Sequence, residues 1–242
     1  MRVALEDQVI VITGASRGIG RATALELAKG HARLALLGRD EAALTQAGRA
    51  AEALGAEVRC YGGDLRDHAR SAAIAQEVQT AFGQVDALVN NAAVGKYGSF
   101  LDLGLEDWRQ MLEVNVLGLV AVTRAFLPAM LARGSGHILN VSSVQGLRAT
   151  ATSSAYSATK FALMGLSQSL AQDVGARGIR VSVLCPGSVE TDFDGFPGYL
   201  KPGAMLPEEV AEAIRDMLES AGRVHMSEVV LLPFGKRPTP GS

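Results

Sequence analysis

The stretch VITGASRGIG (residues 11–20) places three glycines, a serine and an arginine at the end of an apolar run. The residues before the glycines are predicted to form a buried strand, and those after them a helix. In such a unit the helix N-terminus offers free N–H groups and a partial positive charge, and glycine lets a phosphate approach the backbone. Gly14, Gly18 and Gly20 therefore predict a dinucleotide-binding turn, in a variant of the usual glycine spacing.

Short apolar runs alternate with longer Ala-rich segments along the rest of the chain. The predicted strands are 9–13, 33–38, 57–62, 86–91, 137–143, 179–187 and 228–233. The predicted helices are 18–29, 40–54, 67–82, 106–132 and 154–176. Continuously apolar strands separated by helices imply a parallel sheet covered on both faces. We expect one α/β domain over residues 1–242, a doubly wound Rossmann-type sheet of about seven strands.

Composition excludes several classes of protein. The chain has 242 residues, of which 48% are hydrophobic, and this is ample for the core of one large domain. A net charge of −2 gives no basic field for nucleic acid. Arg124 interrupts the apolar run VLGLVAVTRAFLPAML, and no uncharged segment reaches the roughly 20 residues of a membrane span. The N-terminus does not resemble a signal peptide, so a cytoplasmic location is expected.

Residues that commonly bind metals are scattered. Cys60 and Cys185 lie far apart and are expected to be reduced core residues. No metal site is expected from the four histidines, which are His31, His68, His137 and His225. Residues 193–207, rich in Gly and Pro with three aromatics, are predicted to be a loop that covers the substrate, and residues 235–242 to be a frayed tail.

The end of the second predicted strand, LLGRD, indicates which cofactor is bound. NAD-specific sites usually place an acid there for the ribose 2′-hydroxyl, but Gly38 stands at that position and Arg39 follows it. Together with Arg17 of the glycine turn, Arg39 suits a 2′-phosphate and predicts NADP(H). The alternative is that both arginines are solvated surface residues. Asp40 is the competing acid, and we interpret it as the N-cap of the next helix.

A tyrosine and a lysine share one face of the predicted helix 154–176. Tyr156 and Lys160 are four residues apart, and an ammonium group favours the tyrosinate, whose reference pKa is near 10. The pair therefore predicts a proton-transfer site. Ser143, thirteen residues before Tyr156 at the end of a strand, could hold a substrate carbonyl oxygen. Ser142 competes for this role and is interpreted as structural.

The motifs together resemble the short-chain dehydrogenase/reductase family over nearly the whole chain. In order they are TGASRGIG, GDL, NNAA, Asn115, SS…YSATK and PGSVETD. The resemblance implies an NADP(H)-dependent oxidoreductase that transfers a hydride between nicotinamide and a carbonyl or secondary alcohol. It implies that Ser143 polarises the carbonyl and that Tyr156 donates or accepts the proton. It also implies that Lys160 lowers the pKa of Tyr156 and holds the nicotinamide ribose, while Asn115 supports a proton-relay water.

The same resemblance implies the cofactor-binding residues. They are Gly14, Ser16, Arg17, Gly18, Ile19, Gly20, Arg39, Asp64, Leu65, Asn91, Ala92, Tyr156, Lys160, Pro186, Gly187, Val189 and Thr191. The chain departs from the family pattern in two places. Ala93 replaces the glycine of the usual NNAG motif, and the C-terminus lacks the Gly-Gly turn of many tetrameric relatives. A homo-oligomer, dimer or tetramer, built at least from the helices 106–132 and 154–176 is still expected.

Two other functions fit the same motifs. A 3-oxoacyl-[acyl-carrier-protein] reductase would use the same chemistry, with Arg133 and Arg177 near helix ends as possible contacts for an acidic carrier. A non-catalytic NADP(H) sensor would not need the complete set of Asn, Ser, Tyr and Lys. Among the aromatic residues, the sequence leaves open whether Tyr97 and Phe100 line the substrate pocket. Trp108, with Leu105 and Met111, is interpreted as helix packing.

Overall fold

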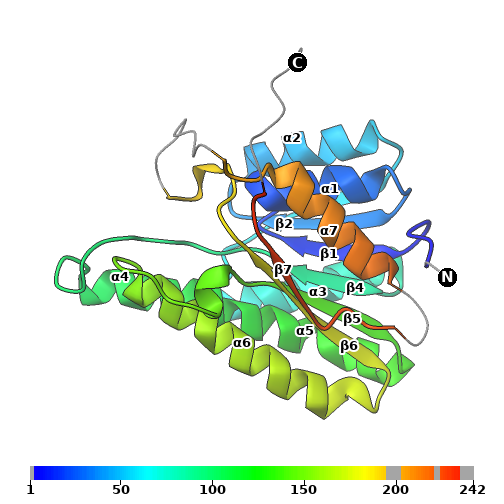
Figure 1. Cartoon of the computed structure of the whole chain (residues 1–242). Helices are drawn as coiled ribbons and strands as arrows, with labels where there is room; N and C mark the ends of the chain where they lie inside the picture. The colour runs from blue at the N-terminus through cyan, green and yellow to red at the C-terminus, as the bar shows by residue number, and fades with distance from the viewer. Residues whose placement is uncertain (1–2, 195–202, 221–223, 235–242) are drawn as a thin grey trace.

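A computed structural model describes residues 3–194, 203–220 and 224–234. Its centre is a seven-stranded sheet in the order β3-β2-β1-β4-β5-β6-β7 (Figure 1), and every pairing is parallel. The expected doubly wound α/β fold is confirmed. The strands are β1 (Val9–Thr13), β2 (Arg33–Gly38), β3 (Glu57–Gly62), β4 (Ala87–Asn90), β5 (Gly136–Val141), β6 (Ile179–Pro186) and β7 (Glu228–Leu231).

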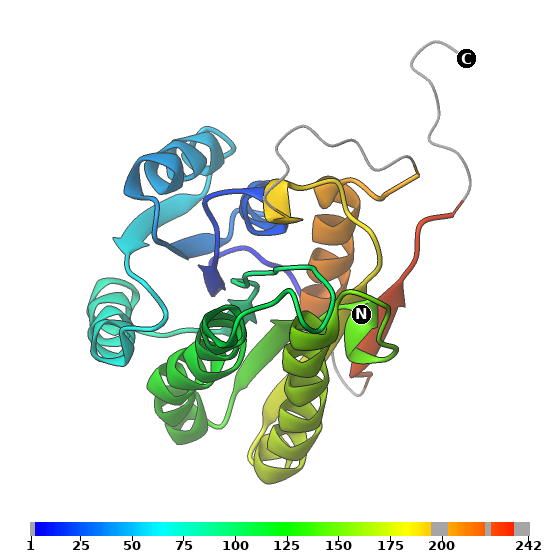
Figure 2. The same ribbon diagram turned by 90° about the vertical axis from the view of Figure 1, so that its left-hand side faces the viewer.

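Helices cover both faces of the sheet (Figures 1 and 2). One layer contains α1 (Gly18–Ala28), α2 (Glu41–Glu52) and α7 (Pro207–Glu219). The other contains α3 (His68–Phe82), α4 (Leu105–Leu112), α5 (Leu119–Arg133) and α6 (Ser154–Gly175). Short 3₁₀ turns, η2 (Val144–Gly146) and η3 (Asp192–Asp194), follow β5 and β6.

Alternate side chains of the central strands enter two separate cores. Ile10 and Ile12 of β1 belong to the core that includes residues of α1 and α7, whereas Val9 and Val11 belong to the core that includes residues of α3 and α5. All four are fully buried, which explains why the strand is apolar without interruption. Because the chain leaves β1 toward β2 and then returns to β4 on its other side, the order switches at this point. Ligands of open parallel sheets bind at the carboxyl edge near such a switch.

The two edge strands are more exposed than the sequence predicts. Cys60 lies on β3 and is exposed, so its assignment to the core was wrong. The cause is topological, because β3 has a partner only on its β2 side. Cys185 on β6 is buried as expected, and both thiols are free.

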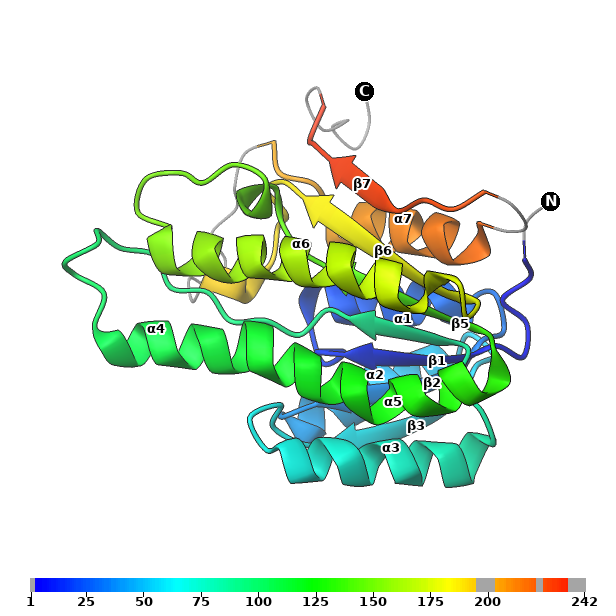
Figure 3. The same ribbon diagram turned by 90° about the horizontal axis from the view of Figure 1, so that it is seen from below.

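The predicted helix 106–132 is interrupted by a π-helical segment, η1 (Glu113–Gly118), between α4 and α5. The combined helix 105–133 has the length and composition to cross a membrane, but 44% of its most apolar window is buried inside the protein. It packs against α3 and α6 (Figure 3). Trp108 and Met111 pack near Tyr156 as expected, whereas Leu105 is 82% exposed and its assignment to packing was wrong.

Candidate active site

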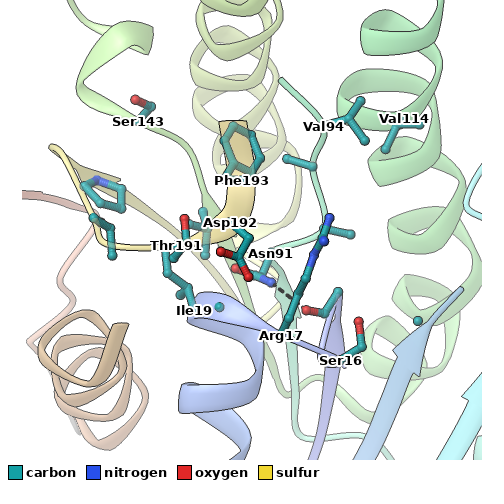
Figure 4. Close-up of a pocket in the computed structure, with 18 of the residues that line it drawn as sticks. Ser16, Arg17, Ile19, Asn91, Val94, Val114, Ser143, Thr191, Asp192 and Phe193 are labelled. Carbon is teal, nitrogen blue, oxygen red and sulfur yellow. Dashed lines mark hydrogen bonds between the residues drawn. The ribbon is translucent and has the colours of Figure 1, made fainter. Parts of the chain in front are cut away.

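A pocket of about 640 Å³ opens at the carboxyl ends of the central strands, around the start of α1 (Figure 4). All the predicted cofactor residues except Gly20 line this pocket. All the predicted catalytic residues except Asn115 line it as well. The glycine turn and the Tyr156–Lys160 pair, more than 130 residues apart in sequence, therefore share one cavity.

The glycine turn could not form with larger residues. Gly14 and Gly18 have φ values of +66° and +53°, in the region that favours glycine. A Cβ at Gly20 would lie 2.2 Å from the Gly14 carbonyl oxygen, so only glycine lets the turn pack against the start of α1. Gly20 itself does not line the pocket. The Asn91 side-chain amide donates to the carbonyls of Thr13 and Gly14, at 3.0 and 3.3 Å, and ties the end of β4 to the turn.

The start of α1 is suited to a phosphate group. Arg17 is its N-cap residue and makes no side-chain cap, and the first turn contains no acidic residue. The N–H groups at this helix end therefore keep their partial positive charge. Figure 4 shows the Arg17 side chain extending into the pocket from this position. The turn thus fits the diphosphate of a dinucleotide, with backbone donors and room for close approach.

Charged residues gather where the pocket meets β2 and β3. Arg39 follows β2, Asp64 follows β3, and both line the pocket. Hydrogen bonds from Arg66 lower the pKa of the Asp64 carboxyl, so it is ionised at neutral pH. Asp40, the competing acid, accepts a hydrogen bond from Ala43 N–H at 3.0 Å and caps α2 as predicted.

Lys160 lines the pocket close to the Tyr156 ring. Its Nζ donates to the Val141 carbonyl at 2.9 Å and lies 5.6 Å from the centre of the Tyr156 ring. Burial, which leaves the residue 3% exposed, lowers the pKa of the Lys160 ammonium to about 8. The group is therefore mostly charged at neutral pH, and two of its three N–H donors remain for other partners.

The two serines after β5 face different surroundings. Ser143 Oγ accepts the Gln145 N–H at 3.1 Å, which leaves its own proton available to a group in the pocket. Ser142 Oγ donates to the Lys160 carbonyl at 3.4 Å and joins β5 to α6. Ser142 also lines the pocket, so the structural role expected for it stays a prediction.

Asn115, on the π-helical segment, holds the loop after β4. Its Oδ1 accepts the Val94 N–H and its Nδ2 donates to the Val94 carbonyl, both at 2.8 Å. Nδ2 also donates to Thr159 Oγ1 at 3.1 Å, and that hydroxyl donates to the Tyr156 carbonyl at 2.7 Å. In this structure Asn115 therefore positions Val94 and α6 and does not face the pocket.

Aromatic and apolar side chains surround the Tyr156 end of the pocket. The rings of Tyr97 and Phe193 each lie 5.6 Å from the Tyr156 ring, on separate chain segments. Phe100 does not line the pocket and instead packs on Trp108, at 5.8 Å. Phe193, the first residue of the predicted covering loop, lines the pocket. Lining residues that the sequence did not predict include Val94, Val114, Val144, Gln145 and Asp192. Their only sequence signal was proximity to the motifs, since Gln145 follows Ser143 by two residues and Asp192 directly follows Thr191.

Part of the predicted covering loop lies outside the described residues. Phe193 is described and contacts Tyr156, and residues 203–207 are described as well. Phe196 and Tyr199 lie outside the described residues, as does the predicted tail 235–242. The closing role of 193–207 stays a prediction.

The remaining candidates, the possible metal ligands and Arg133, contact other parts of the fold. Within the described parts of the chain, no cluster of His, Cys, Asp and Glu could hold a metal ion. His137 is buried on β5, and its Nε2 lies 2.8 Å from Ser182 Oγ on β6. Arg133 donates to the carbonyls of Val85 and Ser135, at 2.7 and 2.9 Å, so its guanidinium group is bound to its own chain.

Comparison with known proteins places this site in a family. The chain is 34% identical over 232 residues to an uncharacterized oxidoreductase of Staphylococcus saprophyticus, covering 96% of this chain and 99% of the relative. It is 34% identical over 214 residues to the ketoacyl reductase HetN of Nostoc, covering 87% and 75%. An alcohol dehydrogenase from the archaeon Thermococcus sibiricus, solved in complex with 5-hydroxy-NADP, superposes with a TM-score of 0.89 at 33% identity, covering 97% and 100%. Because the short chain dehydrogenase family model also matches residues 8–196, the chain belongs to the short-chain dehydrogenase family of oxidoreductases.

Proposed function

We propose that the protein is an NADPH-dependent oxidoreductase that interconverts a carbonyl compound and its secondary alcohol. The observation that carries the proposal is the meeting of Ser143, Tyr156 and Lys160 in one pocket with the glycine turn. A phosphate-binding turn alone would suit many nucleotide-binding proteins. The addition of a hydroxyl donor, a phenol and a buried ammonium supports proton transfer beside a bound cofactor.

Each side chain has a distinct proposed role. When bound, the nicotinamide cofactor supplies or accepts the hydride. The Ser143 hydroxyl donates a hydrogen bond to the substrate carbonyl oxygen, and the Tyr156 hydroxyl gives that oxygen its proton. The Lys160 ammonium favours the tyrosinate electrostatically and uses a remaining N–H for the cofactor ribose. In alcohol oxidation the same groups act in the opposite direction.

The proposed preference for NADPH rests on Arg17 and Arg39. Both line the pocket, and no acid stands at Gly38 to bind a ribose 2′-hydroxyl. Charge-assisted hydrogen bonds are worth about 1.5–3 kcal/mol each, so two of them support at least about tenfold discrimination. The complex of the related alcohol dehydrogenase with 5-hydroxy-NADP agrees with this preference.

The surroundings of Tyr156 support an uncharged organic substrate. Val94, Tyr97, Val144 and Phe193 line the pocket with apolar and aromatic side chains. A 3-oxoacyl thioester is the second candidate, because HetN is a ketoacyl reductase. The internal hydrogen bonds of Arg133 argue against its predicted use for an acidic carrier protein.

The test is oxidation of NADPH and NADH with a panel of aromatic and alicyclic ketones, aldehydes, diketones and a 3-oxoacyl thioester. We expect NADPH-dependent reduction of at least one uncharged ketone. If NADPH binds but no panel member is reduced, a regulatory NADP(H)-binding protein becomes the better interpretation. Equal use of NADH and NADPH would contradict the proposed cofactor preference.

A further inference from the structure

An acid lies between two arginines at the end of the pocket lined by Arg39 and Asp64. The Asp64 carboxylate accepts Arg66 Nη2 at 2.7 Å, Arg66 Nε at 3.1 and 3.2 Å, and the Arg66 main-chain N–H at 2.9 Å. Arg39 Nη1 lies 3.9 Å from Asp64 Oδ2. Within the described residues this is the only ionic contact of Arg39. Arg39 and Arg66 therefore compete for the Asp64 carboxylate, and Arg66 hydrogen-bonds both oxygens of that group.

The backbone fixes this arrangement. Gly63 N–H donates to the Gly38 carbonyl at 3.1 Å, so the residues that follow β2 and β3 are joined. Asp67 N–H donates to the Asp64 carbonyl at 3.0 Å and closes the turn that carries Arg66. Arg66 is not among the residues that line the pocket, whereas Asp64 is. In this structure Asp64 therefore links Arg66 to the pocket.

The charge of Asp64 matters because of what binds beside it. A carboxylate without Arg66 would attract the Arg39 guanidinium and repel a 2′-phosphate. Because Asp64 is ionised at neutral pH, protonation does not remove this charge, and only pairing can balance it.

We propose that Arg66 is a specificity residue for the cofactor, which acts by neutralising Asp64 and so leaves Arg39 available to a 2′-phosphate. The proposal rests on the proposed NADPH-dependent function and adds to it a residue outside the pocket. Arg66 is a positioning residue, because it reaches the cofactor site only through the carboxylate. The NADP(H) preference is thus set by a triad, Arg39, Asp64 and Arg66, rather than by Arg39 alone.

The test measures dissociation constants of NADPH and NADH, and of the fragments 2′,5′-ADP and 5′-AMP, which need no catalysis. In Arg66→Ala we expect the preference for the 2′-phosphorylated member of each pair to fall about tenfold, a common size for coupling between sites. Arg66→Gln keeps a donor and removes the charge, and should do the same. In an Asp64→Asn background, Arg66→Ala should change the preference less than about twofold, because no carboxylate remains to neutralise. The control is Arg33→Ala, which removes an arginine paired with Glu57 outside the pocket.

Two results would overturn the role of Arg66. One is an unchanged preference in both Arg66→Ala and Arg66→Gln. The other is an equal loss with and without the Asp64 carboxylate, which would mean that Arg66 contacts the phosphate itself. The affinities of the parent protein distinguish a failure of the role of Arg66 from a failure of the proposed function. Equal affinity of the parent for NADPH and NADH would contradict the NADPH preference, while the shift caused by Arg66→Ala would still report on Arg66.

Discussion

At the residue scale, Ser143 and Ser142 are neighbours with different hydrogen bonds. Ser143 accepts the Gln145 N–H and has its proton available, whereas Ser142 donates to the Lys160 carbonyl. Ser143→Ala is expected to slow carbonyl reduction about 10²-fold, the usual cost of losing one donor to a developing oxyanion. NADPH affinity should stay within about twofold of the parent.

Ser142→Ala is the matched control for this prediction, because it removes the adjacent hydroxyl. Its lost hydrogen bond is long, at 3.4 Å, so turnover should remain within a few-fold of the parent. Turnover and NADPH titration of both variants provide the measurement. A larger loss of turnover in Ser142→Ala than in Ser143→Ala would reverse the assignment.

Residues inside motifs could be predicted from sequence, and residues that only line the pocket could not. The glycine turn and the Tyr156–Lys160 pair have fixed local spacings, because a tight turn and one helix face impose them. Phe193 was predicted only as part of the covering loop 193–207, and its contact with Tyr156 depends on the path of the chain after β6, which has no local signature. Arg66 was not singled out from the sequence, because the role proposed for it depends on β2 and β3 being neighbours in the sheet.

At the element scale, the pairing of β5 with β6 buries His137. Burial is the main cause that lowers the pKa of His137 to about 3, from an ordinary value of 6.5. Its neutral form is favoured in the folded state, so the unfolded chain binds more protons between these two pH values. The free energy of unfolding should therefore fall as pH decreases from 6.5 toward 3.

Urea unfolding of the parent and of His137→Gln tests this expectation. The parent should lose about 2–4 kcal/mol more stability than the variant between pH 7 and pH 4, because the variant has no proton to take up there. His68→Gln replaces an exposed histidine and serves as the control for the substitution itself. Parallel pH profiles for the parent and His137→Gln would contradict the burial of a neutral histidine.

The strands and most helices were predictable because both cores select uninterrupted apolar runs. The π-helical segment was not, because its sequence EVNVLG fits an ordinary helix as well. It nevertheless places Asn115 where it holds both the loop after β4 and α6. The exposure of Cys60 was also missed, since strand order cannot be read from one strand's sequence.

At the scale of the whole molecule, apolar side chains remain exposed along α4–α5 and α6. They include Leu105, Leu112, Leu117 and Phe161, and the helices that carry them run side by side (Figure 3). We predict that this face joins two copies of the chain, because exposed apolar side chains on neighbouring helices can mark an interface. Light scattering at micromolar concentration should give at least a dimer, and Leu117→Glu with Phe161→Glu should give a monomer. A monomeric parent protein would contradict this prediction.

Tyr156→Phe tests the proposed chemistry most directly, since it removes one hydroxyl from a ring that stays packed between Tyr97 and Phe193. Turnover with NADPH is measured on a substrate that the parent reduces, while circular dichroism and NADPH titration confirm that the variant folds and binds cofactor. We predict that reduction slows by about 10²–10⁴-fold with NADPH affinity unchanged, as expected when a general acid is lost. A folded, NADPH-binding variant whose turnover stays within a few-fold of the parent would contradict the assignment of Tyr156 as the proton donor.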